Sequence, residues 1–423
     1  MIPDGRIPLE RPSKNFNRAA IYAGGAAVSV LLLFSRRPDA LLDPQFWAED
    51  GRNWYADAYN HGVLQPFVTP EAGYIQTFSR AAALISQAVP LEYAPLAFNL
   101  LALAVQVAVA LFILSPRMET LIPDVRWRAA AAFLYLAMPH SWEVFANVTN
   151  SQWHLAFLTM LMVIAAAPKS ISGKVIDTAT ASLSGVSGPF CFLLLPVMVL
   201  TYLIKRESRL IPMIAATAAG CGVQAYFLMT SVRAIQSDRG AGFEAFARIV
   251  GRHLAAGPLI GGSGFDRIAD AGFWTGAIPY LAAACAIGFF AGVIWKGTTE
   301  LRLLGIYSAL IVAAALYSPA VTLQPGQWEA IASNNIALRY WFIPAMFFYL
   351  TLISLVGRER GKLRAAACIL LLTVLAGAML DWRQPQLKDM DFAAHAERFK
   401  QTPAGTAVKI PINPDWEMEL IKR

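Results

Sequence analysis

Long apolar runs, separated by short polar segments, recur along most of the chain. Residues 94–114, 273–295 and 340–356 are examples, and none of these three runs contains a charged side chain. A helix of about 20 apolar residues is long enough to cross the hydrocarbon core of a bilayer. The pattern therefore predicts an all-α polytopic membrane protein.

The first apolar run, 19–34, follows a basic stretch. Signal peptides share that order, but no small-residue cleavage site follows the run cleanly and many further runs come after it. We expect it to be retained as the first of about 11 transmembrane helices. The expected crossings lie near residues 19–35, 95–115, 127–140, 152–168, 174–187, 189–204, 210–231, 273–295, 302–320, 338–356 and 364–380.

Basic residues divide the connecting segments into two sets. Residues 139–151 and 318–338 contain no Lys or Arg, whereas the segments 117–128, 205–209 and 358–364 contain several. Basic segments stay on the cytoplasmic side of a membrane. We therefore expect a bacterial inner-membrane protein with a cytoplasmic N-terminus and an extracytoplasmic C-terminus.

Composition agrees with this interpretation. Only 15% of the residues are charged, compared with about 25% in soluble proteins. The net charge of +7 follows from the basic cytoplasmic loops, so we expect membrane lipids and no nucleic acid as partners. The four cysteines show no CxxC spacing, which gives no indication of a metal site.

Two segments do not fit a simple series of crossings. Residues 74–89 are moderately apolar, but a crossing there would invert the charge pattern of every later loop, so we expect a juxtamembrane or re-entrant helix. Residues 175–204 are short for two full crossings and contain the break Ser184-Gly185-Val186-Ser187-Gly188-Pro189. Such a break is tolerated where it lines a cavity or packs on protein, which makes it a candidate site.

The expected organisation is one transmembrane domain, 1–380, with outer loops at 36–73 and 231–272, and a short extracytoplasmic tail, 381–423. The second loop contains a Gly-rich run at 261–264, which we expect to be flexible. The tail is expected to contain a short strand at 407–412.

Adjacent carboxylates follow the first crossing. Glu49 and Asp50 lie in the first outer loop, directly after Phe46-Trp47-Ala48. A carboxylate there is suited to general-base catalysis, and two together are suited to bind a divalent cation. Alternatively, Asp50 is the N-cap of a helix at 54–59. The residues alone do not decide whether a cation is present.

The loop after the third expected crossing combines amides, a carboxylate, histidines and tryptophans. Sugars are bound by such a mixture, because hydroxyl groups need polar partners and C–H faces stack on aromatic rings. Alternatively, the tryptophans belong to an interfacial aromatic belt. The candidate substrate-binding residues are His140, Glu143, Asn147, Asn150, Gln152, Trp153 and His154.

A third polar group precedes the tenth expected crossing. Arg339 lies at the outer end of that crossing, where the charge rule predicts no basic residue. Its planar guanidinium can bind a phosphate through two points, although a snorkelling arginine that anchors the helix end is the alternative. The candidate residues of this group are Gln327, Asn334, Arg339 and Tyr340.

Together these features resemble the GT-C superfamily, the integral-membrane glycosyltransferases that use polyprenyl-phosphate sugars. The resemblance covers the layout of residues 19–380, with Glu49 and Asp50 at the position of the acidic motif and Arg339 at that of a late phosphate-binding arginine. The given sequence differs from well-known members in lacking a large outer C-terminal domain.

The resemblance implies a donor, an acceptor and a mechanism. The donor is a polyprenyl-phosphate sugar, and the acceptor is a glycan or lipid of the cell envelope. Asp50 or Glu49 is expected to deprotonate the acceptor hydroxyl, and Arg339 to stabilise the departing lipid phosphate. His140, Asn150, Gln152 and Trp153 are expected to line the sugar site.

Two other functions stay open. A transporter or lipid-linked-saccharide flippase would also use a broken helix, although no inverted repeat is visible. A polysaccharide polymerase or ligase would use basic residues in a late outer loop. The second loop offers Arg233, Arg239, Arg248, Arg252, His253 and Arg267. No Walker loop or GxSxG elbow is present, so the sequence gives no support for a nucleotide-driven machine or a serine hydrolase.

Overall fold

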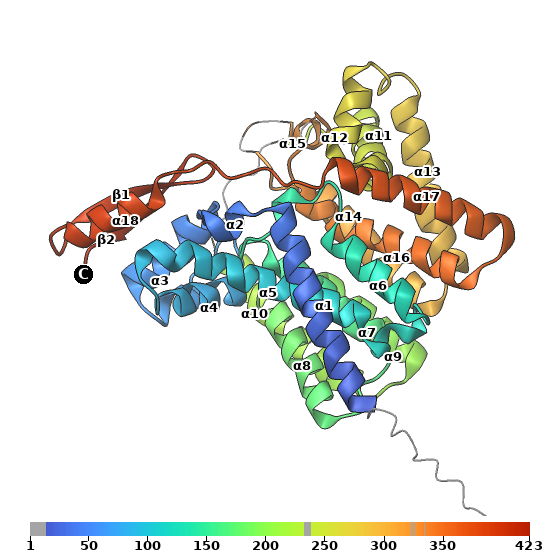
Figure 1. The fold of residues 1–423 in the computed structure, drawn as a ribbon, viewed down its shortest axis with the longest axis horizontal. Coiled ribbons are helices and arrows are strands. Elements are labelled where there is room, and N and C mark those ends of the chain that lie inside the picture. Colours follow the sequence, from blue (N-terminus) through green and yellow to red (C-terminus); the bar gives the residue numbers. More distant parts are fainter. Residues whose placement is uncertain (1–13, 232–237, 323, 325, 334) are drawn as a thin grey trace, which may run out of the picture.

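The structure is a computed structural model that describes residues 14–231, 238–322, 324, 326–333 and 335–423. Figure 1 shows a bundle of helices with a small unit, formed by the end of the chain, extending from one side. Strand is confined to one two-stranded sheet in the described residues. The chain is an all-α polytopic membrane protein in architecture.

Helices occur near each of the expected crossings. Within the described residues, seven segments are long and apolar enough to cross a membrane: Ala19–Arg36, Leu91–Leu114, Leu210–Thr230, Ile278–Lys296, Thr299–Tyr317, Leu338–Arg358 and Gly361–Leu380. The helices that contribute to them are α1 (Lys14–Arg36), α5 (Ala94–Leu114), α10 (Leu210–Thr230), α13 (Ile278–Lys296), α14 (Thr299–Tyr317), α16 (Phe342–Arg358) and α17 (Gly361–Leu380).

Four further helices near the expected crossings are shorter. They are α6 (Val125–Leu136), α7 (Ser151–Ile164), α8 (Ile171–Gly185) and α9 (Cys191–Lys205), with 12 to 15 residues each. At 1.5 Å per residue they fall short of a bilayer core of about 30 Å. The prediction of about 11 crossings therefore stays a prediction.

Helix α7 is the centre of the bundle, and every one of its residues is buried. Its last carbonyl groups would be unpaired in such a position. Two basic side chains bind them: Arg209 donates to Met162 at 2.8 Å and Lys205 to Ile164 at 2.7 Å. Just beyond the helix, Arg117 donates to Ala166 at 2.9 Å. The short helix thus ends inside the protein without unsatisfied carbonyls.

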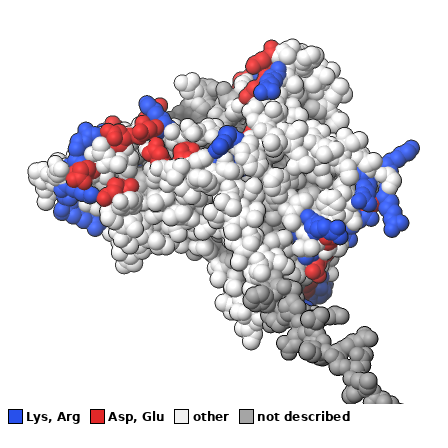
Figure 2. All heavy atoms as spheres, in the orientation of Figure 1, with Lys and Arg blue, Asp and Glu red and all other residues white. Residues whose placement is uncertain are grey.

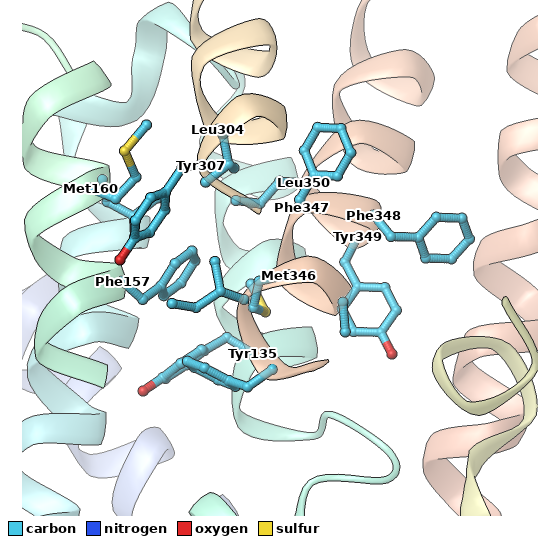
Figure 3. Packing of buried hydrophobic residues seen from close by; sticks show 14 of the residues in the cluster. Tyr135, Phe157, Met160, Leu304, Tyr307, Met346, Phe347, Phe348, Tyr349 and Leu350 are labelled. Carbon is cyan, nitrogen blue, oxygen red and sulfur yellow. The ribbon is translucent and has the colours of Figure 1, made fainter. Parts of the chain in front are cut away.

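Large apolar side chains fill the space around α7. Figure 3 shows Phe157 and Met160 of this helix facing Tyr307 of α14 and Met346 of α16. All four residues are almost completely buried. This close packing fixes the central helix against its neighbours.

Several short elements precede α5 on the chain. They are α2 (Asp39–Leu42), the π-helical turn η1 (Asp50–Tyr55), α3 (Ala56–His61), η2 (Gln65–Val68), α4 (Thr77–Ser86) and η3 (Leu91–Tyr93). Helix α4 lies within the segment 74–89, and its ten residues span about 15 Å. That length is too short for a full crossing. The remaining short helices are η4 (Pro116–Thr120), η5 (Trp142–Val144), α15 (Gln327–Ser333) and η7 (Leu338–Trp341).

The second outer loop is largely helical, which differs from the prediction of a loop with a flexible Gly-rich run. It contains α11 (Phe243–Val250), η6 (Gly251–Ala256) and α12 (Gly257–Asp270). Gly261 has a φ of 75° and interrupts α12. The next two backbone N–H groups, of Gly262 and Ser263, donate to the carboxylate of Asp381 at 2.6 and 2.9 Å. This carboxylate, more than 100 residues away in sequence, fixes the run.

The end of the chain folds against the first outer loop. Helix α18 (Phe392–Gln401) precedes strands β1 (Ala407–Ile412) and β2 (Trp416–Ile421), which pair in antiparallel register from Ala407↔Ile421 to Ile412↔Trp416. The predicted strand at 407–412 is therefore confirmed. Phe46 of the first loop lies 5.3 Å from Phe392, ring centroid to centroid. The tail and the first loop thus share a hydrophobic core.

Charged side chains are distributed unevenly over the surface. Figure 2 shows acidic and basic side chains mixed on the α18–β1–β2 unit and basic ones projecting on the opposite side, with a broad uncharged zone between them. The projecting group includes the turn between α16 and α17 and the first residues of α17, where Arg360, Lys362 and Arg364 are exposed. Such an uncharged zone between polar ends is typical of a protein embedded in a membrane.

Candidate functional site

Asp50 is buried and joins the first outer loop to the segment 148–149. Its side chain is 1% exposed. Oδ2 accepts a hydrogen bond from the backbone N–H of Val148 at 3.0 Å, and Oδ1 accepts from both the N–H and the hydroxyl of Thr149 at 2.8 Å. The hydroxyl oxygen of Thr149 in turn accepts from the indole N–H of Trp54 at 2.9 Å.

This geometry corrects the N-cap alternative. Asp50 is the first residue of η1, preceded by Glu49, and the start of η1 has no side-chain cap. The carboxylate instead satisfies donors of the loop at 148–149, which lie far away in sequence. Burial raises the pKa of Asp50 to about 7, against the opposing effect of the bonds from Thr149 and Val148. Both oxygens are engaged, so Asp50 is poorly placed to accept a proton from a substrate.

Glu49 is the half-buried member of the pair. Its carboxylate makes no hydrogen bond to the side chain of any other residue in the described part of the chain. Burial raises its pKa; its own backbone N–H and the charge of Arg339 oppose the rise, and Glu71 and Glu143 add to it. Of the two adjacent carboxylates, Glu49 is therefore the one that lies within electrostatic range of Arg339.

Arg339 is oriented by Glu143. The carboxylate of Glu143 pairs with the guanidinium and also accepts the backbone N–H of Arg339 at 3.1 Å. The Nη2 group donates to Ala320 at 2.9 Å and to the Tyr340 hydroxyl at 3.5 Å. A guanidinium has five N–H groups, and these contacts use three of them. The other two have no partner among the described residues and are available to an anion.

The helix break between α8 and α9 forms one wall of this region. The backbone N–H of Thr77 donates to Val186 at 3.1 Å, and that of Phe78 donates to the Ser187 hydroxyl at 3.0 Å. Gly188 has a φ of 136°, and a Cβ at that position would lie 2.1 Å from Oε1 of Gln152. The break therefore packs on protein, against the start of α4 and the side chain of Gln152.

Gln152 connects this wall to the outer loops. Its Nε2 donates to Gln76 and to the carbonyl of Thr149, each at 3.2 Å. Its Oε1 is buried and has no hydrogen-bond partner in the described structure. Burial raises the pKa of the neighbouring Tyr74 to about 12, and the charge of Arg339 opposes this rise. Gln152 and Tyr74 thus belong to the same polar cluster as Arg339.

Aromatic rings lie beside the polar cluster. The ring of Trp153 is 5.7 Å from that of Tyr340 and 4.5 Å from that of Phe190, between centroids. Trp47 lies 5.7 Å from Trp142 in an edge-on arrangement. The structure therefore brings Glu49, Glu143, Gln152, Trp153, Arg339 and Tyr340 into one region, and that this region binds a sugar stays a prediction.

Other predicted residues shape the loops around the site. The side-chain amides of Asn147 and Asn150 both donate to the carbonyl of Glu143 at 2.8 Å. Gln327 accepts from the backbone N–H groups of Val321 and Thr322 at 3.0 and 3.2 Å. These amides are used within the protein, and a direct substrate contact for them stays a prediction.

The two predicted histidines lie in different surroundings. His154 is 3% exposed and bonds to the hydroxyl of Tyr135 and the carbonyl of Val144, each at 2.8 Å. It borders a cavity of about 20 Å³, room for one water molecule. His140 faces the second outer loop, with its Nε2 3.2 Å from Nδ1 of His253. The structure does not place either ring beside Arg339.

Two basic residues of the second loop, Arg248 and Arg252, are engaged with the protein. Arg248 pairs with Glu329 at 2.9 Å, and Arg252 donates to Oδ1 of Asn335 at 2.6 Å. These contacts hold the second loop to the segment around α15. Two predicted residues, Arg233 and Asn334, lie outside the described residues.

Three residues near the site have no sequence pattern that predicts a functional role: Glu71, Tyr74 and Gln76. Their one distinguishing feature is that they directly precede the short segment that forms α4. In the described parts of the chain, no group of three or more His, Cys, Asp and Glu side chains is placed to hold a metal ion. With both oxygens of Asp50 engaged, Glu49 alone of the acidic pair is open to a cation.

Comparisons with known proteins do not identify a relative. No protein-family model matches the chain, and no curated protein matches it.

Proposed function

We propose that the chain is an integral-membrane glycosyltransferase of the GT-C type. It transfers a sugar from a polyprenyl-phosphate donor to a glycan or lipid acceptor of the cell envelope, on the extracytoplasmic side. The observation that carries the proposal is the guanidinium of Arg339, which Glu143 orients while two of its N–H groups have no partner among the described residues. Glu49 lies within electrostatic range of this guanidinium. A base and a phosphate-binding cation in one region are what transfer from a sugar phosphate requires.

Glu49 is assigned the role of general base. A base works best when its pKa lies near the working pH, and burial raises the pKa of Glu49 in that direction. The proton of the acceptor hydroxyl passes to Glu49 as the acceptor oxygen bonds to the anomeric carbon. The bond between that carbon and the phosphate oxygen breaks, and its electron pair leaves with the polyprenyl phosphate.

Arg339 is assigned the role of binding the phosphate group that departs from the sugar. Glu143 orients the guanidinium from one edge, and the two N–H groups without a partner in the described structure are free to bind phosphate oxygens. Trp153 and Tyr340 offer aromatic faces to the sugar. Asp50 supports this arrangement by fixing Val148 and Thr149.

The helix break supports this function more than transport. Its polar groups bond to the start of α4, so it is suited to a fixed wall of a binding site. A transporter needs such a break to rearrange during alternating access.

The test is sugar transfer by the purified protein in proteoliposomes. A panel of undecaprenyl-phosphate-linked hexoses and pentoses is supplied with extracted envelope glycans and lipids. We expect one donor to release undecaprenyl phosphate as its sugar appears on an acceptor. Movement of a lipid-linked sugar across the bilayer without its cleavage would establish a flippase instead.

A substitution of Arg339 distinguishes a phosphate-binding role of this residue from that of an interfacial helix anchor. Arg339→Lys keeps a charge that reaches the interface but loses the planar fork. We expect this variant to weaken use of the donor by about 1–3 kcal/mol, the scale of a hydrogen bond to a charged group, with normal expression. Equal activity of wild type and Arg339→Lys would reduce Arg339 to an interfacial anchor.

A further inference from the structure

The end of the chain pairs with the backbone just before Glu49. The N–H of Ala48 donates to the carbonyl of Asn413 at 2.7 Å, and the N–H of Asn413 donates to the carbonyl of Phe46 at 3.3 Å. These two bonds form a bridge between Trp47 and Asn413. The segment that leads into the site is thus paired with the turn between β1 and β2.

The same hairpin also contacts the backbone just after Asp50. A Cβ on Gly51 would lie 2.9 Å from Cδ1 of Ile412, the last residue of β1. The guanidinium of Arg52 lies over the ring of Trp416 at 4.9 Å. Hairpin residues therefore touch the chain on both sides of the two carboxylates.

The hairpin turn is itself firmly held. The Asn413 side chain, 5% exposed, accepts from the backbone N–H of Lys388 at 3.0 Å and donates to its carbonyl at 2.9 Å. Phe392 of α18 packs on Phe46. Because buried amides with both partners satisfied resist displacement, Asn413 presents a fixed backbone to the first loop.

Ala48 needs such support. Its φ is 46°, a left-handed conformation that is unfavourable for a residue with a side chain. Residues in this conformation persist where surrounding contacts hold them. The bond from Ala48 to Asn413 is one of these contacts, and it lies one residue before Glu49.

We infer that the β1–β2 hairpin is a positioning element that fixes the carboxylate of Glu49 through Ile412 and Asn413. The expected effect on sugar transfer rests on the function proposed above. The expected effect on the position of the side chain at residue 49 does not. Ile412 and Asn413 touch no substrate in this inference; they act through the backbone of the first loop.

Gly51 and Ile412 allow a direct test. Gly51→Ala adds a methyl group against Ile412, and Ile412→Val removes the Cδ1 atom that it meets. We expect Gly51→Ala to lower kcat by about 10- to 100-fold, the scale of a small misplacement of a catalytic group, with KM for the donor nearly unchanged. The acid limb of the pH profile should shift as well, because the surroundings of Glu49 change.

The double variant Gly51→Ala with Ile412→Val should recover part of the lost kcat; recovery is partial because Phe46 also lies close to Gly51. Gly222→Ala is the matched control, since that glycine has open space around it, and it should behave as wild type. Wild-type kcat in Gly51→Ala, or a loss that Ile412→Val does not relieve, would overturn the inference.

A second readout does not depend on sugar transfer. In the full chain with its four cysteines replaced, Glu49→Cys is alkylated with a charged, membrane-impermeant thiol reagent. We expect Gly51→Ala to change the alkylation rate several-fold, and Ile412→Val to bring it back towards the original rate. This labelling pattern, together with a wild-type protein that transfers no sugar, would retain the positioning role and reject the glycosyltransferase. An unchanged rate in every variant would reject the positioning role, whatever the transfer activity.

Discussion

Oδ1 of Asp50 lies 2.8 Å from both the backbone nitrogen and the hydroxyl oxygen of Thr149. One carboxylate oxygen thus accepts two hydrogen bonds from a residue almost 100 positions away in the sequence. The neighbouring Glu49 makes no comparable contact within the described structure and is within range of Arg339. Two adjacent acidic residues therefore have different tasks, one in holding the loops together and one in the site.

Asp50→Asn tests the structural task. The amide keeps an acceptor for Thr149 but turns an NH₂ group toward the N–H of Val148, so one buried donor is left unpaired. We expect a loss of stability of about 1–3 kcal/mol, measured by thermal unfolding in detergent. Any loss of sugar transfer should be proportional to the loss of folded protein. Unchanged stability would mean that the tie to the loop at 148–149 is unimportant.

His140 and His253 predict a dependence of stability on pH. Burial lowers the pKa of His140 from 6.5 to about 4, with Arg252 adding to the effect and Asp381 opposing it; burial also lowers the pKa of His253. Between about pH 6.5 and 4 the unfolded chain binds protons that the folded chain does not. Stability from these groups is therefore lost as pH falls through this window.

The variant His140→Gln isolates that effect. Unfolding temperatures at pH 7 and pH 5 are compared with those of wild type. We expect the variant to lose less stability on acidification, by roughly half of the histidine contribution, because His253 remains. An identical pH dependence in the two proteins would show that folding does not shift the pKa of His140.

Orientation is tested by labelling single cysteines in a background without the four native ones. Ala404→Cys lies in the exposed tail, and Lys362→Cys lies in the exposed basic first turn of α17. The loop charge pattern predicts that an impermeant thiol reagent reaches the first from outside and the second only after permeabilisation. The reverse result would place Glu49 and Arg339 on the cytoplasmic side.

Local patterns in the sequence predict the elements but not how they meet. Apolar runs indicate the long helices, and the break at 184–189 is where α8 gives way to α9. The strand at 407–412 is also recognisable. By contrast, nothing local signals that Asp381 binds the N–H groups of Gly262 and Ser263, because each partner looks like an ordinary polar residue until the fold brings them together.

The candidate site shows the same limit. The types of its residues are recognisable, since Glu49, Glu143 and Arg339 are polar groups at the ends of apolar runs. Which carboxylate is free and which is engaged depends on tertiary contacts, here those of Asp50 with Val148 and Thr149. The helical content of the second loop was missed for a related reason: its glycines predict flexibility unless a distant carboxylate satisfies their N–H groups.

The most direct test of the central claim is the rate of sugar transfer by Glu49→Gln, per folded protein at pH 7. The control is Asp43→Asn, a neutralised and exposed carboxylate of the same loop. We predict that Glu49→Gln folds normally and loses transfer by about 10²–10⁴-fold, as expected for removal of a general base, while Asp43→Asn transfers sugar at the wild-type rate. Wild-type transfer by Glu49→Gln would contradict the assignment of Glu49 as the base.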